Sequence, residues 1–173
     1  RDCLLSRGLG DVYKRQVQRD RDIIFHDICL NDVCITKGAV ARIVYLSVEC
    51  DGIQALSCGG DGVIVSTPSG STAYNLSAGG PIVEPDARNM LITPICAHDM
   101  ASRCIVTSDR RVITVRMTQN ARRNAFVSVD GGKSVRLNMG DTVTIRRSRL
   151  DTKLLKLNDR SFYDVVNAKF QGK

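Results

Sequence analysis

Residues 59–85 read GGDGVIVSTPSGSTAYNLSAGGPIVEP, a stretch that concentrates glycine, hydroxyl side chains and two carboxylates. Its short run Val63–Ser66 is bounded by glycine and proline, which predicts a buried strand ending in a tight loop. Glycines let a backbone approach a bound molecule closely, and the hydroxyl groups supply donors and acceptors. The same residues are also typical of a turn system whose Ser and Thr cap a helix beginning near Thr72. Composition alone leaves both interpretations open.

Short strands are predicted on both sides of this stretch. Alternating apolar residues from Ile43 to Cys50 predict one strand, and Asp51-Gly52 predicts a tight turn into a second strand at 53–58. Further strands are predicted at 104–107, 111–117, 126–129, 134–137 and through 143–145. The clearest hairpin joins 126–129 to 134–137 around Asp130-Gly131-Gly132.

A helix is predicted only near the end of the chain and directly after the glycine-rich loop. The apolar residues of the C-terminal segment, Phe162, Val165, Val166 and Phe170, share one helical face. Ser161 is a suitable N-cap, and Asp164 lies at the favourable end of the helix dipole. We therefore predict an all-β sandwich of many short strands, with a short helical segment after the glycine-rich loop and a C-terminal helix.

Length and composition restrict the class of protein. The 173 residues suffice for one domain with a real core, and 43% of them are hydrophobic. No apolar run approaches the roughly 18 residues needed to cross a bilayer, and the start shows no secretory signal. We therefore expect no membrane association and a cytoplasmic location.

The cysteines and the net charge point to no metal and no nucleic acid. Seven cysteines at irregular spacings, with no CxxC pair, predict free thiols rather than disulfides or a zinc site. The net charge of +7 is scattered along the chain. Aromatic residues make up 5% and Trp is absent, so the stacking platforms of single-strand binders are poorly supplied. Phosphorylated small molecules fit a mildly basic surface equally well.

The first 16 residues, RDCLLSRGLGDVYKRQ, show no sustained period and do not join naturally to the segment that begins at Val17. We interpret residues 1–16 as a non-native leader, to be excluded from reasoning about the fold. The domain is accordingly expected to comprise residues 17–173.

The block DGVIVSTPSGSTAYNLSAGGPIV at 61–83 resembles, over its whole length, the signature of the ATP-NAD kinase family. The usual form is close to DG-x-I-x-(S/T)-TPTGSTAY-x-LSAGGPI, and Ser69 stands where Thr is usual. Flanking segments are similar to the same family: CLNDVCI at 29–35, LITPICAHDMASR at 91–103 and VSVDGGKSVRLNMGDTVTI at 127–145. The tail at 154–170 is similar to the closing helix of the family, without its usual Lys-Leu-Gly-Trp ending. The resemblance spans about Asp27 to Phe170.

This resemblance implies a reaction and a domain plan. NAD kinases transfer a phosphoryl group from ATP, or in some members polyphosphate, to the adenosine 2′-hydroxyl of NAD and so form NADP; Mg²⁺ accompanies the ATP. Their N-terminal α/β domain and C-terminal β-sandwich enclose the active site, and homo-oligomers are common. The catalytic aspartate of the family belongs to a GGDG motif in the N-terminal domain. The GGDG at 59–62 runs into the STPSGSTAY block and is not that motif. We therefore expect no catalytic residue in this chain and no kinase activity without the N-terminal domain.

The resemblance also implies which residues bind NAD. Asn31 and Asp32 are expected to contact the adenosine moiety, where the alternative from the residues alone is an Asx turn before a strand. Asp61 is expected to hydrogen-bond the dinucleotide. Five further residues are expected to line the pocket, namely Thr72, Ala73, Tyr74, Asn75 and Ser77. Asp130, which a hairpin turn also explains, and His98 are candidate contacts only.

Three other functions stay open at this point. The chain could be a non-catalytic dinucleotide-binding or regulatory module, which would have its own start near residue 17. It could be related to lipid kinases, which share the two-domain plan, although the TPSGSTAY block fits NAD kinases much better. A basic nucleic-acid-binding β-domain is the third alternative.

Overall fold

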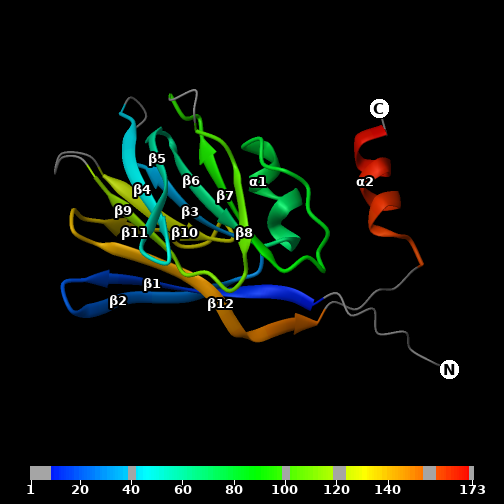
Figure 1. Cartoon of the computed structure of the whole chain (residues 1–173), viewed down its shortest axis with the longest axis horizontal. Helices are drawn as coiled ribbons and strands as arrows, with labels where there is room; N and C mark the ends of the chain where they lie inside the picture. Colours follow the sequence, from blue (N-terminus) through cyan, green and yellow to red (C-terminus); the bar gives the residue numbers. More distant parts are fainter. Residues whose placement is uncertain (1–8, 39–41, 99–101, 119–123, 154–158, 172–173) are drawn as a thin grey trace.

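The chain forms two six-stranded antiparallel sheets packed face to face in the computed structural model (Figure 1). The structure describes residues 9–38, 42–98, 102–118, 124–153 and 159–171. In spatial order, the first sheet contains β2 (Asp22–Cys29), β1 (Leu9–Arg19), β12 (Thr142–Lys153), β9 (Ile113–Met117), β4 (Val44–Cys50) and β5 (Ile53–Gly60). The second contains β11 (Val135–Leu137), β10 (Ala125–Val129), β3 (Asp32–Lys37), β6 (Gly62–Ser66), β7 (Asn89–Ile95) and β8 (Ile105–Ser108). The predicted all-β sandwich is confirmed.

The helical segments are few and lie outside the sheets. The 3₁₀ turn η1 (Ser69–Thr72) and the single-turn helix α1 (Tyr74–Ser77) follow β6, and α2 (Phe162–Gln171) lies near the C-terminal end. This arrangement confirms both predicted helical segments. Among the described helices, none is long and apolar enough to cross a membrane.

Most of the core lies between the two sheets, and β6 explains why its sequence lacks alternation. Val63 and Val65 of β6 point into the core between the sheets. Ile64 points the other way, onto the outer face of the second sheet, where it packs with Cys34 of β3 and Ile95 of β7. The segment that includes α1 covers this outer face, so β6 is buried on both sides.

The predicted hairpins form with the expected turn residues. Asp51 and Gly52, between β4 and β5, have φ angles of 51° and 79°, and Asp130 and Gly131, after β10, have 46° and 68°. Asp and Gly tolerate this left-handed region better than most residues, which explains why these pairs mark the turns. Most predicted strand limits differ by one or two residues from those observed, as at 104–107 against β8, whereas the strand through 143–145 belongs to the much longer β12.

The structure corrects the expected N-terminal limit of the fold. Strand β1 runs through the boundary at residue 17 and pairs with both β2 and β12. Tyr13 and Val17 are fully buried in the core, and the Tyr13 hydroxyl donates to the Asn89 carbonyl at 2.7 Å. Residues 9–16 are therefore part of the folded sheet, and excluding them was wrong. Their non-native origin stays a prediction, and residues 1–8 lie outside the described part.

Helix α2 begins with the predicted cap. The Ser161 hydroxyl accepts the Asp164 backbone N–H at 3.1 Å, while the Asp164 carboxylate accepts the Ser161 backbone N–H at 2.9 Å.

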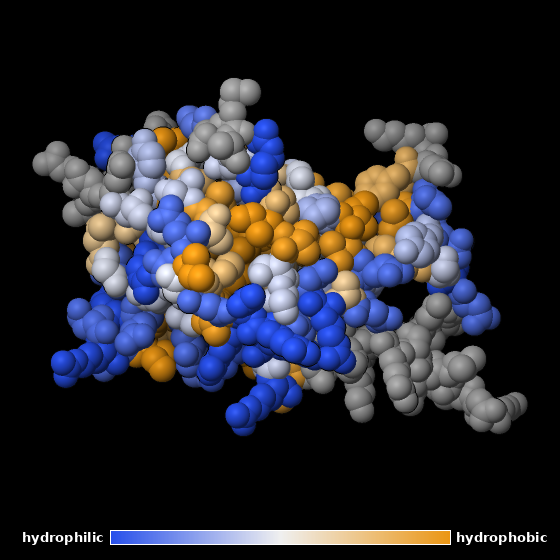
Figure 2. All heavy atoms as spheres, in the orientation of Figure 1, coloured by the Kyte–Doolittle hydropathy of each residue, from blue (hydrophilic) through white to orange (hydrophobic). Residues whose placement is uncertain are grey.

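The Tyr163 hydroxyl of α2 hydrogen-bonds Glu84, which raises the pKa of this tyrosine. In Figure 2, apolar side chains gather over the middle of this face and continue onto α2. Val165 and Phe170 are among the exposed apolar residues.

Candidate functional site

The turn that carries Asn31 and Asp32 is held by Asp130. The two carboxylate oxygens of Asp130 accept the backbone N–H groups of Leu30 at 2.8 Å, Asn31 at 2.8 Å and Asp32 at 3.0 Å. In return, the Asp130 N–H donates to the Asp32 carbonyl at 3.1 Å. Asp130 thus lies in the predicted hairpin turn after β10, and its carboxylate also stabilises the turn between β2 and β3. A contact between Asp130 and a ligand stays a prediction.

The glycine-rich loop packs directly on the same turn. The Thr67 hydroxyl donates to the Leu30 carbonyl at 2.6 Å and accepts the Gly70 N–H at 2.9 Å. The Thr67 N–H donates to the Asn31 carbonyl at 2.8 Å. A Cβ atom on Gly70 would lie 2.1 Å from the Asn31 carbonyl oxygen, so this position requires glycine because of the close approach.

Ser69 begins the η1 turn and was not among the predicted site residues. Its hydroxyl is buried and, within the described part of the chain, has no hydrogen-bond partner. An unsatisfied buried hydroxyl is costly, and a polar ligand atom would satisfy it. The only signal in the sequence was the Ser at a position where the family usually has Thr, which preserves the hydroxyl.

Asp32 lies at the start of β3, with 4% of its surface exposed. The Cys34 thiol donates to the Asp32 carboxylate at 3.2 Å. Burial raises the pKa of Asp32 and the nearby Asp130 charge adds to the increase, while the bond from Cys34 works against it. The pKa of the Asp32 carboxyl therefore depends on its burial and on Cys34 and Asp130.

Asp61 lies near the other end of β3. Strand β3 pairs with β6 from Asp32 opposite Ser66 to Thr36 opposite Gly62. The Asp61 carboxylate forms an ion pair with Lys37, with Nζ and Oδ1 2.6 Å apart. Asp32 and Lys37 are five residues apart in an extended strand, so the two acidic groups mark the ends of a strip roughly 16 Å long.

Tyr74 is the first residue of α1, which packs against β6. Its side chain is 44% exposed, and its pKa is raised first by burial and then by Cys34, Cys96, Asp61 and Asp32. The hydroxyl is therefore close enough to both acidic groups to sense their charges. The fold thus places Asp32 and Asp61 near opposite ends of one strip along the β3–β6 pair, beside the helix that begins with Tyr74.

The remaining predicted residues of this segment divide into surface and interior positions. Thr72 and Ala73 are half-buried between η1 and α1, beside Tyr74, and Ser77 is exposed. Asn75 is fully buried. Its amide nitrogen donates to the carbonyls of Ser71 and Pro81, each at 3.1 Å, and its amide oxygen accepts the Thr93 hydroxyl at 2.6 Å. Asn75 thereby ties α1, the following loop and β7 together.

We expect Asn75→Asp to lower the free energy of unfolding by about 3 kcal/mol, because the carbonyls of Ser71 and Pro81 lose their donor and a charge is buried in its place. Urea unfolding measures this loss. Ser77→Ala, on the exposed side of the same helix, is the matched control and is expected to change stability by less than about 0.5 kcal/mol. Equal stability of the two variants would contradict the role of Asn75.

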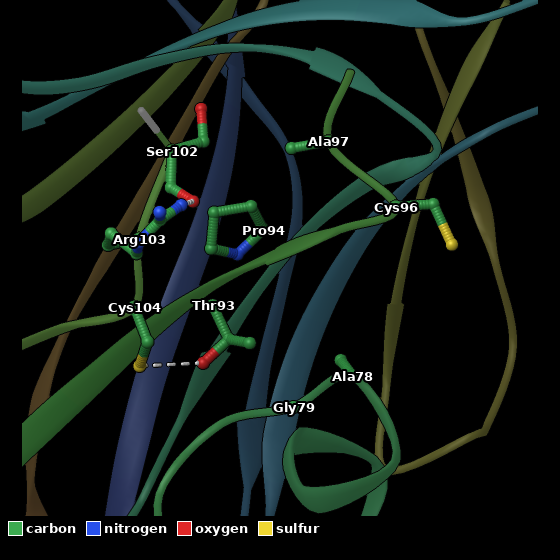
Figure 3. A pocket seen from close by; sticks show the side chains of 9 residues that line it. All are labelled: Ala78, Gly79, Thr93, Pro94, Cys96, Ala97, Ser102, Arg103 and Cys104. Atoms are coloured by element: carbon green, nitrogen blue, oxygen red, sulfur yellow. Dashed lines mark hydrogen bonds between the residues drawn. The ribbon is translucent and has the colours of Figure 1, made fainter. Parts of the chain in front are cut away.

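A pocket of about 320 Å³ lies beside the C-terminal end of α1 (Figure 3). The Thr93 hydroxyl and the Cys104 thiol share a hydrogen bond of 3.1 Å at its wall. The other residues lining it are Ala78, Gly79, Pro94, Cys96, Ala97, Ser102 and Arg103. None of the predicted site residues is among the residues that line this pocket. The exposed His98 follows Ala97 directly, and its backbone N–H donates to the Gly59 carbonyl at 2.9 Å.

Comparison with known families identifies the domain. The profile of the ATP-NAD kinase C-terminal domain matches residues 30–157. The NAD kinase of Ruminiclostridium cellulolyticum is 40% identical over 154 residues, which cover 89% of this chain and 54% of that protein. The NAD kinase of Aquifex aeolicus is 38% identical over 168 residues, which cover 97% of this chain and 60% of that protein.

Solved structures give the same result. The crystal structure of yeast NADH kinase complexed with NADH matches with a TM-score of 0.86 and 25% identity, covering 94% of this chain and 48% of that one. An NAD kinase from Archaeoglobus fulgidus in complex with ATP matches with a TM-score of 0.74 and 28% identity, covering 91% and 59%. The chain spans about half the length of the curated relatives it matches. The profile match over most of the chain, together with the shared sandwich fold, shows that this chain belongs to the NAD kinase family, of which it carries the C-terminal domain.

Proposed function

We propose that this chain forms the NAD-binding part of an NAD kinase, which transfers a phosphoryl group from ATP or polyphosphate to the adenosine 2′-hydroxyl of NAD. One observation carries the proposal: the strip along the β3–β6 pair has an acidic group near each end and lies beside the helix that begins with the half-exposed Tyr74. An elongated ligand with polar groups at both ends and aromatic rings fits such a strip. A pyridine dinucleotide has this chemistry.

Each part of the strip suits one kind of contact. The Asp32 carboxylate, next to the Asn31 amide, suits ribose hydroxyls and ring nitrogens. The half-exposed Tyr74 ring offers a face on which a base can stack. The Ser69 hydroxyl, which has no hydrogen-bond partner within the described residues, would form a hydrogen bond with the same ligand. Thr72 and Ala73 would line the strip beside Tyr74, and His98 stays a candidate contact.

Phosphoryl transfer depends chiefly on positioning of the acceptor hydroxyl and on charge stabilisation. In our proposal the described residues supply the positioning of NAD. Within the described ranges, no group of three or more His, Cys, Asp or Glu residues could hold a metal ion. Following the family resemblance, we propose that Mg²⁺ enters with the ATP phosphates, and that the catalytic aspartate and most of the ATP site are supplied by an α/β domain. Assembly into homo-oligomers is part of the same proposal.

NAD binding by the purified chain tests the proposal. Titration of NAD in a calorimeter is expected to give one saturable site, with ATP, lipid vesicles and oligonucleotides as comparison ligands. The chain alone is expected to form no NADP from ATP, Mg²⁺ and NAD. Tighter binding of oligonucleotides than of NAD would favour the nucleic-acid alternative, and no NAD binding at all would refute the proposal.

The pH dependence of NAD binding is expected to depend on Asp32. Its pKa is raised by burial, so its charge is lost at a higher pH than for an exposed aspartate. If the ionised carboxylate accepts bonds from NAD, affinity falls as the pH is lowered through this raised pKa and recovers above it. Asp32→Asn is expected to bind more weakly at pH 8 and to show a flatter profile. Calorimetry between pH 5 and pH 8 measures both, and an unchanged slope in the variant would contradict this role.

A further inference from the structure

Lys37 forms the ion pair with Asp61 and is not among the residues proposed to contact NAD. Its ammonium nitrogen lies 2.6 Å from Asp61 Oδ1, a short and charge-assisted contact. The two side chains are 24% and 33% exposed, so the pair is neither buried nor fully open to solvent. It lies near the end of the strip opposite to Asp32.

The backbone around this ion pair is tightly constrained. The Lys37 N–H donates to the Asp61 carbonyl at 2.8 Å, and the Asp61 N–H donates to the Ile95 carbonyl at 2.9 Å. A Cβ atom on Gly62 would lie 2.1 Å from the Ile35 carbonyl oxygen, so the chain approaches β3 too closely for a side chain. The main chain of Asp61 is thus anchored to β3 and β7. What stays variable is the orientation of its carboxylate, which Lys37 contacts.

We infer that Lys37 is a positioning residue of the dinucleotide site: its ammonium group holds the Asp61 carboxylate in the orientation that accepts hydrogen bonds from one end of the ligand. The inference rests on the proposed function, because it takes Asp61 as a contact to NAD. Holding the carboxylate before binding lowers the ordering cost that binding would otherwise incur. Lys37 also offsets negative charge near a ligand that carries a pyrophosphate.

Lys37→Met removes the charge and keeps a long apolar stem, so it tests the inference directly. We expect NAD to bind about tenfold more weakly to this variant, while Lys37→Arg, which keeps the charge and the donors, stays within about threefold of the original affinity. Calorimetric titration of the full chain measures both. If Lys37→Met fails to fold, Lys37→Leu, which also removes both the charge and the donors, replaces it in every comparison.

A double-mutant cycle separates positioning from a general structural effect. In the Asp61→Asn background, Lys37→Met is expected to change NAD affinity by less than about twofold, because its target carboxylate is already gone. Arg111→Met is the matched control, since it breaks an ion pair of 2.8 Å with Asp51 at the β4–β5 hairpin. This control is expected to leave NAD affinity unchanged.

The outcomes distinguish the two proposals. If the original chain does not bind NAD, the proposed function fails and this inference fails with it. If the original chain binds NAD and Lys37→Met binds equally well, only the role of Lys37 is wrong. An equal loss of affinity with and without the Asp61 carboxylate would also overturn the inference, because Lys37 would then act independently of Asp61.

Discussion

Asp130→Ala is expected to abolish the shape of the Asn31–Asp32 turn and to weaken NAD binding by at least about tenfold. The carboxylate accepts three successive backbone N–H groups, and alanine leaves all three without this acceptor. Alanine also tolerates the φ of 46° at this position less well than aspartate. Together these losses are expected to lower the free energy of unfolding by about 3 kcal/mol. Urea unfolding and NAD calorimetry measure the two effects.

Asp51→Ala is the matched control for this prediction. Asp51 also has a positive φ, of 51°, and its carboxylate also accepts a backbone N–H, that of Val112 at 2.8 Å. It lies in the β4–β5 hairpin, on the first sheet, whereas the strip lies on the second. Asp51→Ala should therefore lose stability and keep its affinity for NAD. If both variants lose the same fraction of NAD affinity, Asp130 has no special role in the site.

Gly70→Ala is expected to have the second large effect. The added methyl group would lie 2.1 Å from the Asn31 carbonyl oxygen and 2.5 Å from its carbonyl carbon, both of them backbone atoms that cannot rotate away. The glycine-rich loop and the turn must therefore separate. We expect a loss of about 3 kcal/mol in the free energy of unfolding. Because Asn31 and Ser69 both move, NAD binding should become undetectable by calorimetry.

Gly52→Ala distinguishes this clash from ordinary glycine strain. Gly52 has a φ of 79°, and a Cβ atom there would meet nothing within 4 Å. Alanine at this position should cost roughly 1 kcal/mol through its left-handed conformation and leave NAD affinity intact. Normal NAD affinity in Gly70→Ala would show that the contact between loop and turn is not needed for the site.

Some elements of the fold were accessible from local sequence. The hairpins at Asp51-Gly52 and Asp130-Gly131 were predictable because only a few residues adopt positive φ readily. The capping of α2 by Ser161 was predictable because the pattern of cap and acid lies within one helical turn. In each case the determining interaction joins residues that are close in the sequence.

Other elements were missed because their determinants are distant. Strand β7 is buried along nearly all its length, so it shows no alternation of apolar and polar residues. Strand β1 carries a bulge and pairs with β12, which is more than a hundred residues away in the sequence. A strand defined by such partners has no recognisable period of its own. The expectation that the fold begins at residue 17 followed from this lack of pattern.

The candidate site divides in the same way. The stretch around Tyr74 could be found from sequence because its glycines and hydroxyl residues are contiguous and resemble one family closely. The functions of Asp130, Asn75 and Lys37 could not, since each acts through a partner that is distant in sequence or through a backbone group. Asp130 binds the turn at Leu30 from 100 residues away. An aspartate in a hairpin turn has the same sequence signature with or without such a partner.

The sequence by itself determined the class of fold, the turns and the segment proposed to bind the ligand, because periodicity, turn chemistry and a contiguous motif are properties of neighbouring residues. Only the tertiary structure decided which polar groups are available to a ligand and which are occupied by the protein. Hydrogen bonds and burial depend on which strands become neighbours in space, and the antiparallel pairing of β3 with β6 and β10 sets those neighbours here. Because of this pairing, the Asp32 N–H can donate to the Asp130 carboxylate. The same pairing brings the Asp61 carboxylate beside Lys37.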